Sequence, residues 1–276
     1  MPDGSAAALH GPHKLRFNPN LNTAGAINLI TVSNRVFRSH PLALYYLNAE
    51  TGERALVARV KDTIGELHPP NQLVYPDCLE GAKADYRVIY TKSGMEADLV
   101  LLEQLPAPEA FLGTSRSVRL EWVTEFLDPP APQTKTRILK QQADAALRQG
   151  MAEPDLVDST LNFGDLWFPL GRAFVWDSST NTAGAPAQIR LFNPAKETND
   201  VMVAKHWVLE QQRQLLIESA DWSDIAPKLE SLPQAGRVAS ASNLKDRVTK
   251  GRQLPTTKVA AKKSKPMTVR GRTLPR

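Results

Sequence analysis

Three stretches between residues 84 and 126 alternate apolar and polar side chains with the period of two that is typical of a half-buried β-strand. Residues 86–90 form the first stretch, a short turn at 92–94 follows, and residues 95–101 carry the apolar face back. Residues 118–126 repeat the pattern, and the polar positions that interrupt it are Arg119, Glu121 and Glu125. The pattern predicts three consecutive antiparallel strands.

Similar short apolar runs separated by turn residues recur along the chain. Strands are expected at 25–38 (two, with a turn at Ser33-Asn34), 42–47, 56–60, 161–176, 189–192, 201–209 and 213–218. Only residues 138–148 and 222–232 have helical spacing, and Ser223 is the expected N-cap of the second helix. Many short strands and few helices predict an all-β fold, mainly an antiparallel β-sandwich with one or two short helices and disordered termini; a barrel is the related alternative.

Changes in composition divide the chain into three parts. Residues 1–22 are polar and contain prolines, and we predict that they are disordered. Residues 23–232 hold the strands and form the β-sandwich-like domain, with a sub-boundary at the proline-rich segment near 128–137 as an alternative to a long internal loop. Residues 233–276 lack apolar periodicity and form a basic disordered tail or linker.

Charge is distributed unevenly between these parts. The net charge of the chain is +5, but residues 236–276 contain 12 basic residues and one acid, which leaves 22 basic and 28 acidic residues in the body. The single cysteine, Cys78, excludes an intramolecular disulfide and more plausibly packs beside Tyr75 as a small hydrophobic residue. No apolar run is long enough to span a membrane as a helix, and the first residues do not form a signal peptide.

The sequence Y-P-D-C-L-E-G-A-K-A-D-Y-R-V-I-Y-T-K-S-G-M-E-A-D-L-V-L at 75–101 resembles a β-rich module of large bacterial surface proteins that precedes RHS-type or β-propeller-type repeats. The signature positions are Asp85, Tyr86, Glu96, Asp98, Leu99 and Val100, and the resemblance covers most of residues 25–232. It implies an extracellular, non-catalytic scaffold whose partners are further repeats or domains, and it transfers no functional residues. The chain departs from the family in having no secretion signal and in ending with a basic tail, as a truncated or split member would.

Three carboxylates on the central hairpin are the candidate catalytic residues. Asp85, Glu96 and Asp98 could form the carboxylate pair of a carbohydrate-active enzyme, which needs two such groups about 5–9 Å apart. Exposed acids are common on strands, so we favour a solvated strand face, or a bond from Asp98 to a turn backbone.

Aromatic residues suggest a second kind of site. Tryptophans on strands could form a platform that stacks on sugars, although core packing explains them more often. Trp167 and Phe168 are adjacent and therefore point to opposite faces, so one of them is the best candidate for an exposed binding residue. The five histidines are scattered, phosphate-binding loops are absent, and we predict neither a metal nor a cofactor.

The basic tail is the strongest signal that fold does not explain. Its cations could bind nucleic acid through the phosphate backbone, and the densest of them are Lys262, Lys263, Lys265, Arg270 and Arg272. The tail has no aromatic residue for base stacking, so we favour a solvated linker. The leading hypothesis is a non-catalytic structural or binding module; a carbohydrate-active enzyme and a nucleic-acid-associated protein are the alternatives.

Overall fold

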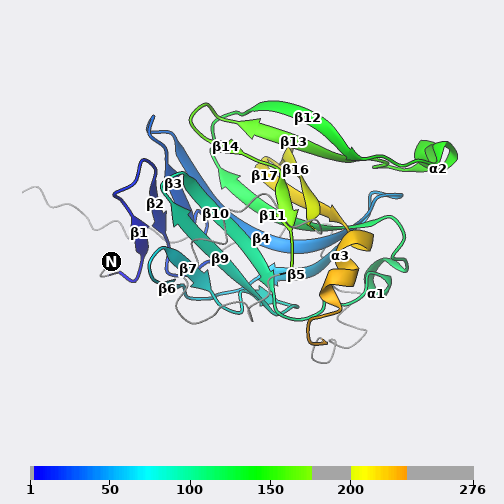
Figure 1. The fold of residues 1–276 in the computed structure, drawn as a ribbon, viewed down its shortest axis with the longest axis horizontal. Coiled ribbons are helices and arrows are strands. Elements are labelled where there is room, and N and C mark those ends of the chain that lie inside the picture. Colours follow the sequence, from blue (N-terminus) through cyan, green and yellow to red (C-terminus); the bar gives the residue numbers. More distant parts are fainter. Residues whose placement is uncertain (1–2, 176–199, 235–276) are drawn as a thin grey trace, which may run out of the picture.

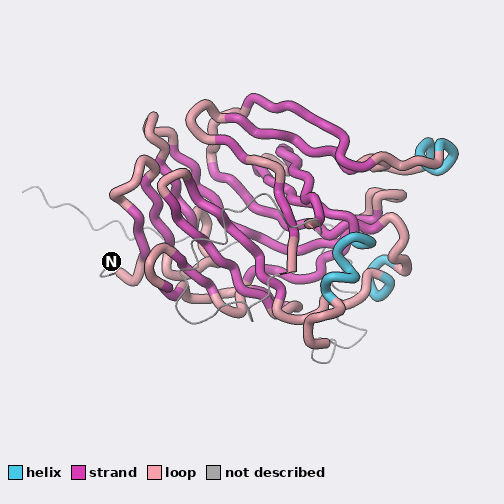
Figure 2. The backbone as a smooth tube through the Cα atoms, viewed as in Figure 1, coloured by secondary structure: helices cyan, strands magenta, loops and turns pink. Residues whose placement is uncertain are grey.

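The fold is mainly antiparallel β, as the alternation predicts (Figures 1 and 2). The computed structural model describes residues 3–175 and 200–234. The largest sheet has ten strands in the order β1-β2-β3-β4-β11-β17-β16-β15, with β5 beside β4 and β8 beside β5. These strands are β1 (Ala6–Ala8), β2 (Lys14–Phe17), β3 (Ile27–Ile30), β4 (Val36–Asn48), β5 (Arg54–Val60), β8 (Leu79–Glu80), β11 (Val118–Leu127), β15 (Gly171–Ala173), β16 (Val201–Glu210) and β17 (Arg213–Asp221).

Two smaller sheets pack on this one. The four-stranded sheet has the order β10-β9-β7-β6 and crosses in front of β4 and β11 in Figure 1. Its strands are β6 (Glu66–His68), β7 (Gln72–Tyr75), β9 (Ala84–Thr91) and β10 (Gly94–Leu101). The three-stranded sheet consists of β12 (Gln133–Lys140), β13 (Leu156–Asn162) and β14 (Trp167–Phe168). The helices are α1 (Glu109–Leu112), α2 (Ala145–Gly150) and α3 (Trp222–Leu229), and among the described residues none is long and apolar enough to cross a membrane.

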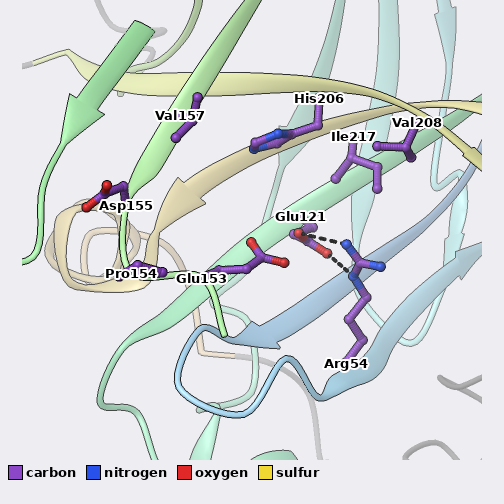
Figure 3. Close-up of a pocket in the computed structure, with 9 residues that line it drawn as sticks. All are labelled: Arg54, Glu121, Glu153, Pro154, Asp155, Val157, His206, Val208 and Ile217. Atoms are coloured by element: carbon purple, nitrogen blue, oxygen red, sulfur yellow. Dashed lines mark hydrogen bonds and ion pairs between the residues drawn. The ribbon is translucent and has the colours of Figure 1, made fainter. Parts of the chain in front are cut away.

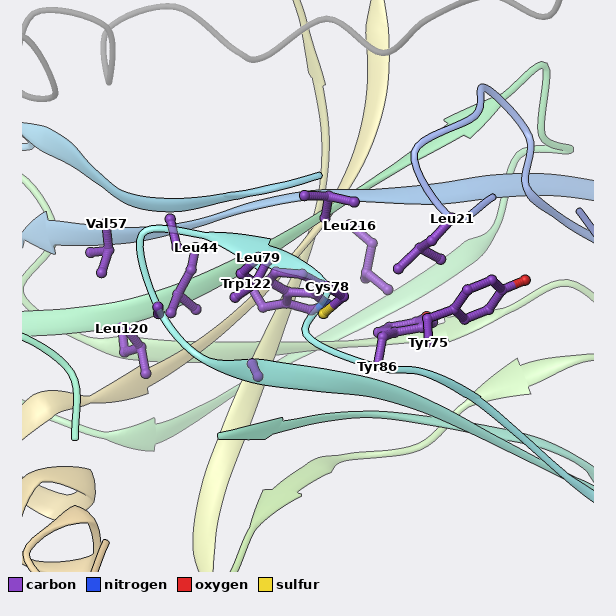
Figure 4. Packing of buried hydrophobic residues seen from close by; sticks show 14 of the residues in the cluster. Leu21, Leu44, Val57, Tyr75, Cys78, Leu79, Tyr86, Leu120, Trp122 and Leu216 are labelled. Atoms are coloured by element: carbon purple, nitrogen blue, oxygen red, sulfur yellow. The ribbon is translucent and has the colours of Figure 1, made fainter. Parts of the chain in front are cut away.

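The main core lies between the ten-stranded and four-stranded sheets. Leu44, Leu120 and Trp122 of the large sheet pack on the same cluster as Tyr75 and Tyr86 of the smaller one (Figure 4). The rings of Trp122 and Tyr86 lie 6.3 Å apart between centroids. This contact between alternating faces of two sheets makes the fold a sandwich.

The opposite face of the large sheet carries a second, smaller apolar cluster. Its members come from β4, β5, β11 and β17, and they are Leu42, Ala43, Tyr45, Leu56, Val123, Leu215 and Ile217. Strand β4 is therefore apolar toward both faces, which explains why residues 42–47 form a continuous apolar run instead of an alternating one.

A buried ion pair joins the three-stranded sheet to the large sheet. Lys205 of β16 donates from Nζ to Asp158 of β13 at 2.8 Å, and its backbone N–H donates to the same carboxylate at 3.1 Å. Both side chains are at most 3% exposed. An aromatic cluster fills the other end of the junction and contains Phe37, Phe126, Phe163, Phe168 and Trp207.

Several local elements differ from the sequence-based predictions. Strands β9 and β10 pair as predicted, but β11 crosses to the other sheet, because residues 102–117 with Pro106, Pro108 and α1 separate it from β10. The predicted helix at 138–148 is wrong at its start, since residues 138–140 complete β12 and the helix begins at Ala145.

The structure also differs from the sequence-based predictions at the two ends of the described domain. The segment 1–22, for which we predict disorder, includes β1 and β2, and Leu15 and Phe17 are buried in the main core. Helix α3 follows Asp221 and not Ser223, which lies inside the helix; Ile225 and Leu229 are buried, as the spacing predicts. The strand expected at 189–192 lies outside the described residues.

Cys78 should not react in the native protein. It is fully buried in the main core beside Tyr75, as predicted, and burial raises the pKa of its thiol to about 12 (Figure 4). Because the thiolate is the reactive form, we expect no modification by iodoacetamide at pH 8 in buffer and complete modification in guanidinium chloride. Mass spectrometry measures both; native labelling at the rate of a free thiol would contradict the assigned packing.

Candidate functional site

A groove of about 340 Å³ lies on the outer face of the large sheet, opposite the main core (Figure 3). Three neighbouring strands form its floor: β11 supplies Glu121, β17 supplies Ile217, and β16 supplies His206 and Val208. These side chains share a face because Ile217 lies opposite Val123 on one side and His206 on the other. Arg54 of β5 closes one end.

Residues 151–155, which we call the wall segment, form the other side of the groove. Its backbone is held to the β4–β5 turn, where the N–H groups of Ala152 and Glu153 donate to the carbonyls of Glu50 and Ala49 at 3.0 and 2.9 Å. The guanidinium of Arg119 donates to the Glu153 carbonyl at 3.0 Å. The segment thus places Glu153, Pro154 and Asp155 along the groove, with Val157 of β13 beyond them.

Each carboxylate that lines the groove is bonded to an arginine. Arg54 donates to both oxygens of Glu121, at 2.7 and 3.5 Å. Arg119 donates to Glu153 at 3.2 Å, and Arg148 donates to both oxygens of Asp155. Figure 3 shows the carboxylate of Glu153 pointing toward that of Glu121, which the dashed lines join to Arg54.

Burial and neighbouring charges shift the pKa values of these groups in different directions. Burial raises the pKa of Glu121, whose side chain is 2% exposed, while Arg54 opposes this shift. Hydrogen bonds from Arg148 lower the pKa of Asp155. Burial lowers the pKa of His206, so its imidazole is neutral at neutral pH and offers one N–H donor and one acceptor.

The three carboxylates that the sequence suggested lie elsewhere and do not line this groove. Asp85 accepts from the backbone N–H of Asp77 at 2.8 Å, so Asp85, and not Asp98 as predicted, makes the bond to a turn backbone. Asp98 accepts from Arg87 of the paired strand at 2.6 Å. Burial, and then Asp98, raise the pKa of Glu96. Asp98 and Glu96 share one face of the β9–β10 hairpin, where Arg87 is the charge partner.

Trp167 and Phe168 lie in different environments, as alternation along a strand predicts. Trp167 is 63% exposed, whereas Phe168 packs on Phe163 and Phe126 with centroids 5.4 and 6.1 Å away. The binding role of Trp167 stays a prediction. Among the other tryptophans, Trp122 is buried and Trp207 and Trp222 pack on the main core, while Trp176 lies outside the described residues.

The sequence did not identify the groove, because alternation on a half-buried strand predicts that the polar face meets water. Arg119, Glu121 and Glu125 alternate with the apolar residues of β11, yet each is less than 9% exposed. The presence of three charged residues on one face of a strand is the sequence signal that could have indicated a polar site here. Comparison with models of protein families, with curated proteins and with solved structures finds no match to this chain.

Glu125 stabilises the same outer face and should make stability depend on pH. Burial alone raises its pKa, but hydrogen bonds from Arg213 and His40 outweigh burial and lower the pKa to about 2. The backbone N–H of Gly25 donates to Nδ1 of His40 at 3.2 Å, so Nε2 carries the proton that faces Glu125 at 3.2 Å.

The expected result is a loss of stability as the pH falls from about 4.5 to about 2. A carboxyl group with a lowered folded-state pKa stabilises the fold above its unfolded pKa, and this contribution disappears as the pH falls through the folded pKa. We expect Glu125→Gln to be less stable than the wild type at pH 7 by about 1–2 kcal/mol after allowance for solvent screening, and the two curves to converge near pH 2. Urea titrations at a series of pH values measure this, with exposed Glu230→Gln as the control; parallel curves would contradict the assignment.

Proposed function

We propose that this chain is a non-catalytic binding or structural module of a bacterial surface or secreted protein, with the outer-face groove as its ligand site. The pairing of every lining carboxylate with an arginine is the observation that supports this proposal most directly. A general acid or base must exchange its proton during turnover, whereas both oxygens of Glu121 and of Asp155 are engaged by guanidinium groups. Such pairs hold strands and the wall segment in place.

The proposed setting is supported by the resemblance of residues 75–101 to modules that precede RHS-type or propeller-type repeats. In that setting the partners are further repeats or domains of a longer surface protein. Antibodies against the full chain should then label intact bacteria that carry its gene, without permeabilisation. Labelling only after lysis would contradict a surface location.

Catalysis is tested with the full chain on a panel of polysaccharides and aryl glycosides. We expect no release of reducing sugar above the rate of a buffer blank. Hydrolysis that Glu121→Gln or Glu153→Gln abolishes would instead establish a carbohydrate-active enzyme, in which the buried Glu121 faces the more exposed Glu153. Loss of that hydrolysis in Asp98→Asn or Glu96→Gln would instead place the active site on the β9–β10 hairpin.

The basic residues from Arg237 to Arg276 support a second, separate hypothesis of nucleic-acid association, and they lie outside the described residues. Twelve cations predict binding that weakens steeply with salt. If the tail is only a linker, deleting residues 236–276 should leave retention on DNA or RNA unchanged at low salt. A large loss of retention would establish the tail as a nucleic-acid contact.

A further inference from the structure

The lining of the groove combines an aliphatic surface with polar side chains around it. Val157, Val208 and Ile217 supply apolar surface, while Glu121, Glu153, Asp155, Arg54 and His206 supply donors and acceptors around it. A ligand that matches this lining has C–H groups on one side and hydrogen-bonding groups along its edge. The volume of about 340 Å³ is at the small end of the range for ligand sites and suits a single ring.

Charge restricts the ligand further. Three carboxylates line the groove, and each is bonded to an arginine: Arg54, Arg119 or Arg148. A charged ligand would have to compete with one of these pairs, and an anion that displaced Glu121 from Arg54 would leave a carboxylate that is only 2% exposed without its bonded guanidinium, which is costly. A neutral ligand can accept from the guanidinium of Arg54, which lines the groove, and donate to the carboxylates without breaking any pair.

His206 also favours a neutral ligand. Its imidazole lies on the floor beside Ile217 and is neutral at neutral pH, because burial disfavours the imidazolium form. A neutral imidazole can bind a hydroxyl group as donor or acceptor, and it adds no charge that would attract an anion.

We infer that the groove binds a neutral, hydroxyl-rich ligand of the size of one sugar ring. The ring C–H groups lie on the aliphatic floor, and neighbouring hydroxyls bond the lining carboxylates and the guanidinium of Arg54. This inference rests on the proposed binding function and specifies its ligand class. It places the sugar in the groove and not on the exposed ring of Trp167.

The test measures binding of methyl glucoside, galactoside, mannoside and N-acetylglucosaminide to the full chain by ligand-observed NMR and calorimetry. Glucuronate and glucosamine serve as charged counterparts. We expect at least one neutral glycoside to bind, and its charged counterpart to bind about tenfold more weakly. No binding of any neutral glycoside, or tighter binding of a charged one, overturns the inference.

Two matched variants locate the site. Val157→Trp fills the groove and should weaken binding at least about tenfold, whereas Trp167→Ala should leave it unchanged. The reverse result overturns the groove assignment and leaves a non-catalytic binding module in place. Circular dichroism confirms that each variant is folded.

A third variant tests the charge balance without filling the groove. Glu153→Gln removes one of the three lining carboxylates, which repel an anion, so the preference for a neutral glycoside over glucuronate should fall about tenfold. An unchanged preference contradicts the role assigned to the ion pairs. Cleavage of a bound glycoside, lost in Val157→Trp, would overturn the non-catalytic function while confirming the groove as the sugar site.

Discussion

Replacing Lys205 by methionine should lower the free energy of unfolding by about 3 kcal/mol or more, since the change leaves a buried carboxylate without its main countercharge. Asp158 is fully buried, and Lys205 supplies both a side-chain and a backbone donor to it. Glu218, directly opposite Lys205 on β17, also loses a stabilising cation. Burial raises the pKa of Glu218 to about 7 against the influence of Lys205.

Urea unfolding at pH 7.5, followed by tryptophan fluorescence, measures this effect. Arg137 provides the matched control, because it approaches the same carboxylate at 3.4 Å but is 54% exposed. We expect Arg137→Gln to cost less than about 1 kcal/mol. The double variant Lys205→Met with Asp158→Asn should recover part of the loss, since it removes the buried charge that has lost its ammonium partner. A cost below about 1 kcal/mol for Lys205→Met would show that the junction tolerates Asp158 without the Lys205 ammonium.

Trp122→Ala should cost about 3–5 kcal/mol, the range found when a large buried aromatic side chain is truncated. Trp122 lies in the main core between the two sheets and packs on Tyr86 of the smaller sheet (Figure 4). Removing the indole loses apolar burial and leaves a cavity that two hydrogen-bonded sheets cannot easily close.

Trp167→Ala is the matched control for this prediction, since it truncates the same residue type at a site that is 63% exposed. We expect it to change stability by at most about 0.5 kcal/mol. Urea titrations of both variants with unchanged slopes would show that the difference lies in the folded state. Equal losses in the two variants would contradict the placement of Trp122 in the core.

Local pattern was sufficient for much of the fold. The turn at Ser33-Asn34, the β9–β10 hairpin and the apolar positions of α3 all follow from residues within a few positions of one another. A strand or helix exposes a periodic face, so its periodicity is present in the sequence before any tertiary contact forms. The proline-rich segment after Phe126, by contrast, leads directly into β12 and gives no helix until Ala145.

The candidate site could not be found in the same way. Its ion pairs join residues far apart in the sequence, such as Arg54 with Glu121 and Arg119 with Glu153. Alternation predicts that Arg119, Glu121 and Glu125 share one face, but whether that face meets water depends on what covers it. The wall segment and Arg213 cover part of that face, through contacts that no local pattern encodes.

The sequence by itself determined that this protein is mainly β, which segments form most of its strands, and that its basic charge is concentrated after residue 235. Tertiary structure alone decided that β11 joins β4 and β17, and that a charged strand face becomes a groove. The physical reason is range: periodicity and turn chemistry act between near neighbours, whereas sheet order, burial of charge and the pairing of Lys205 with Asp158 depend on strands that meet only in the folded chain.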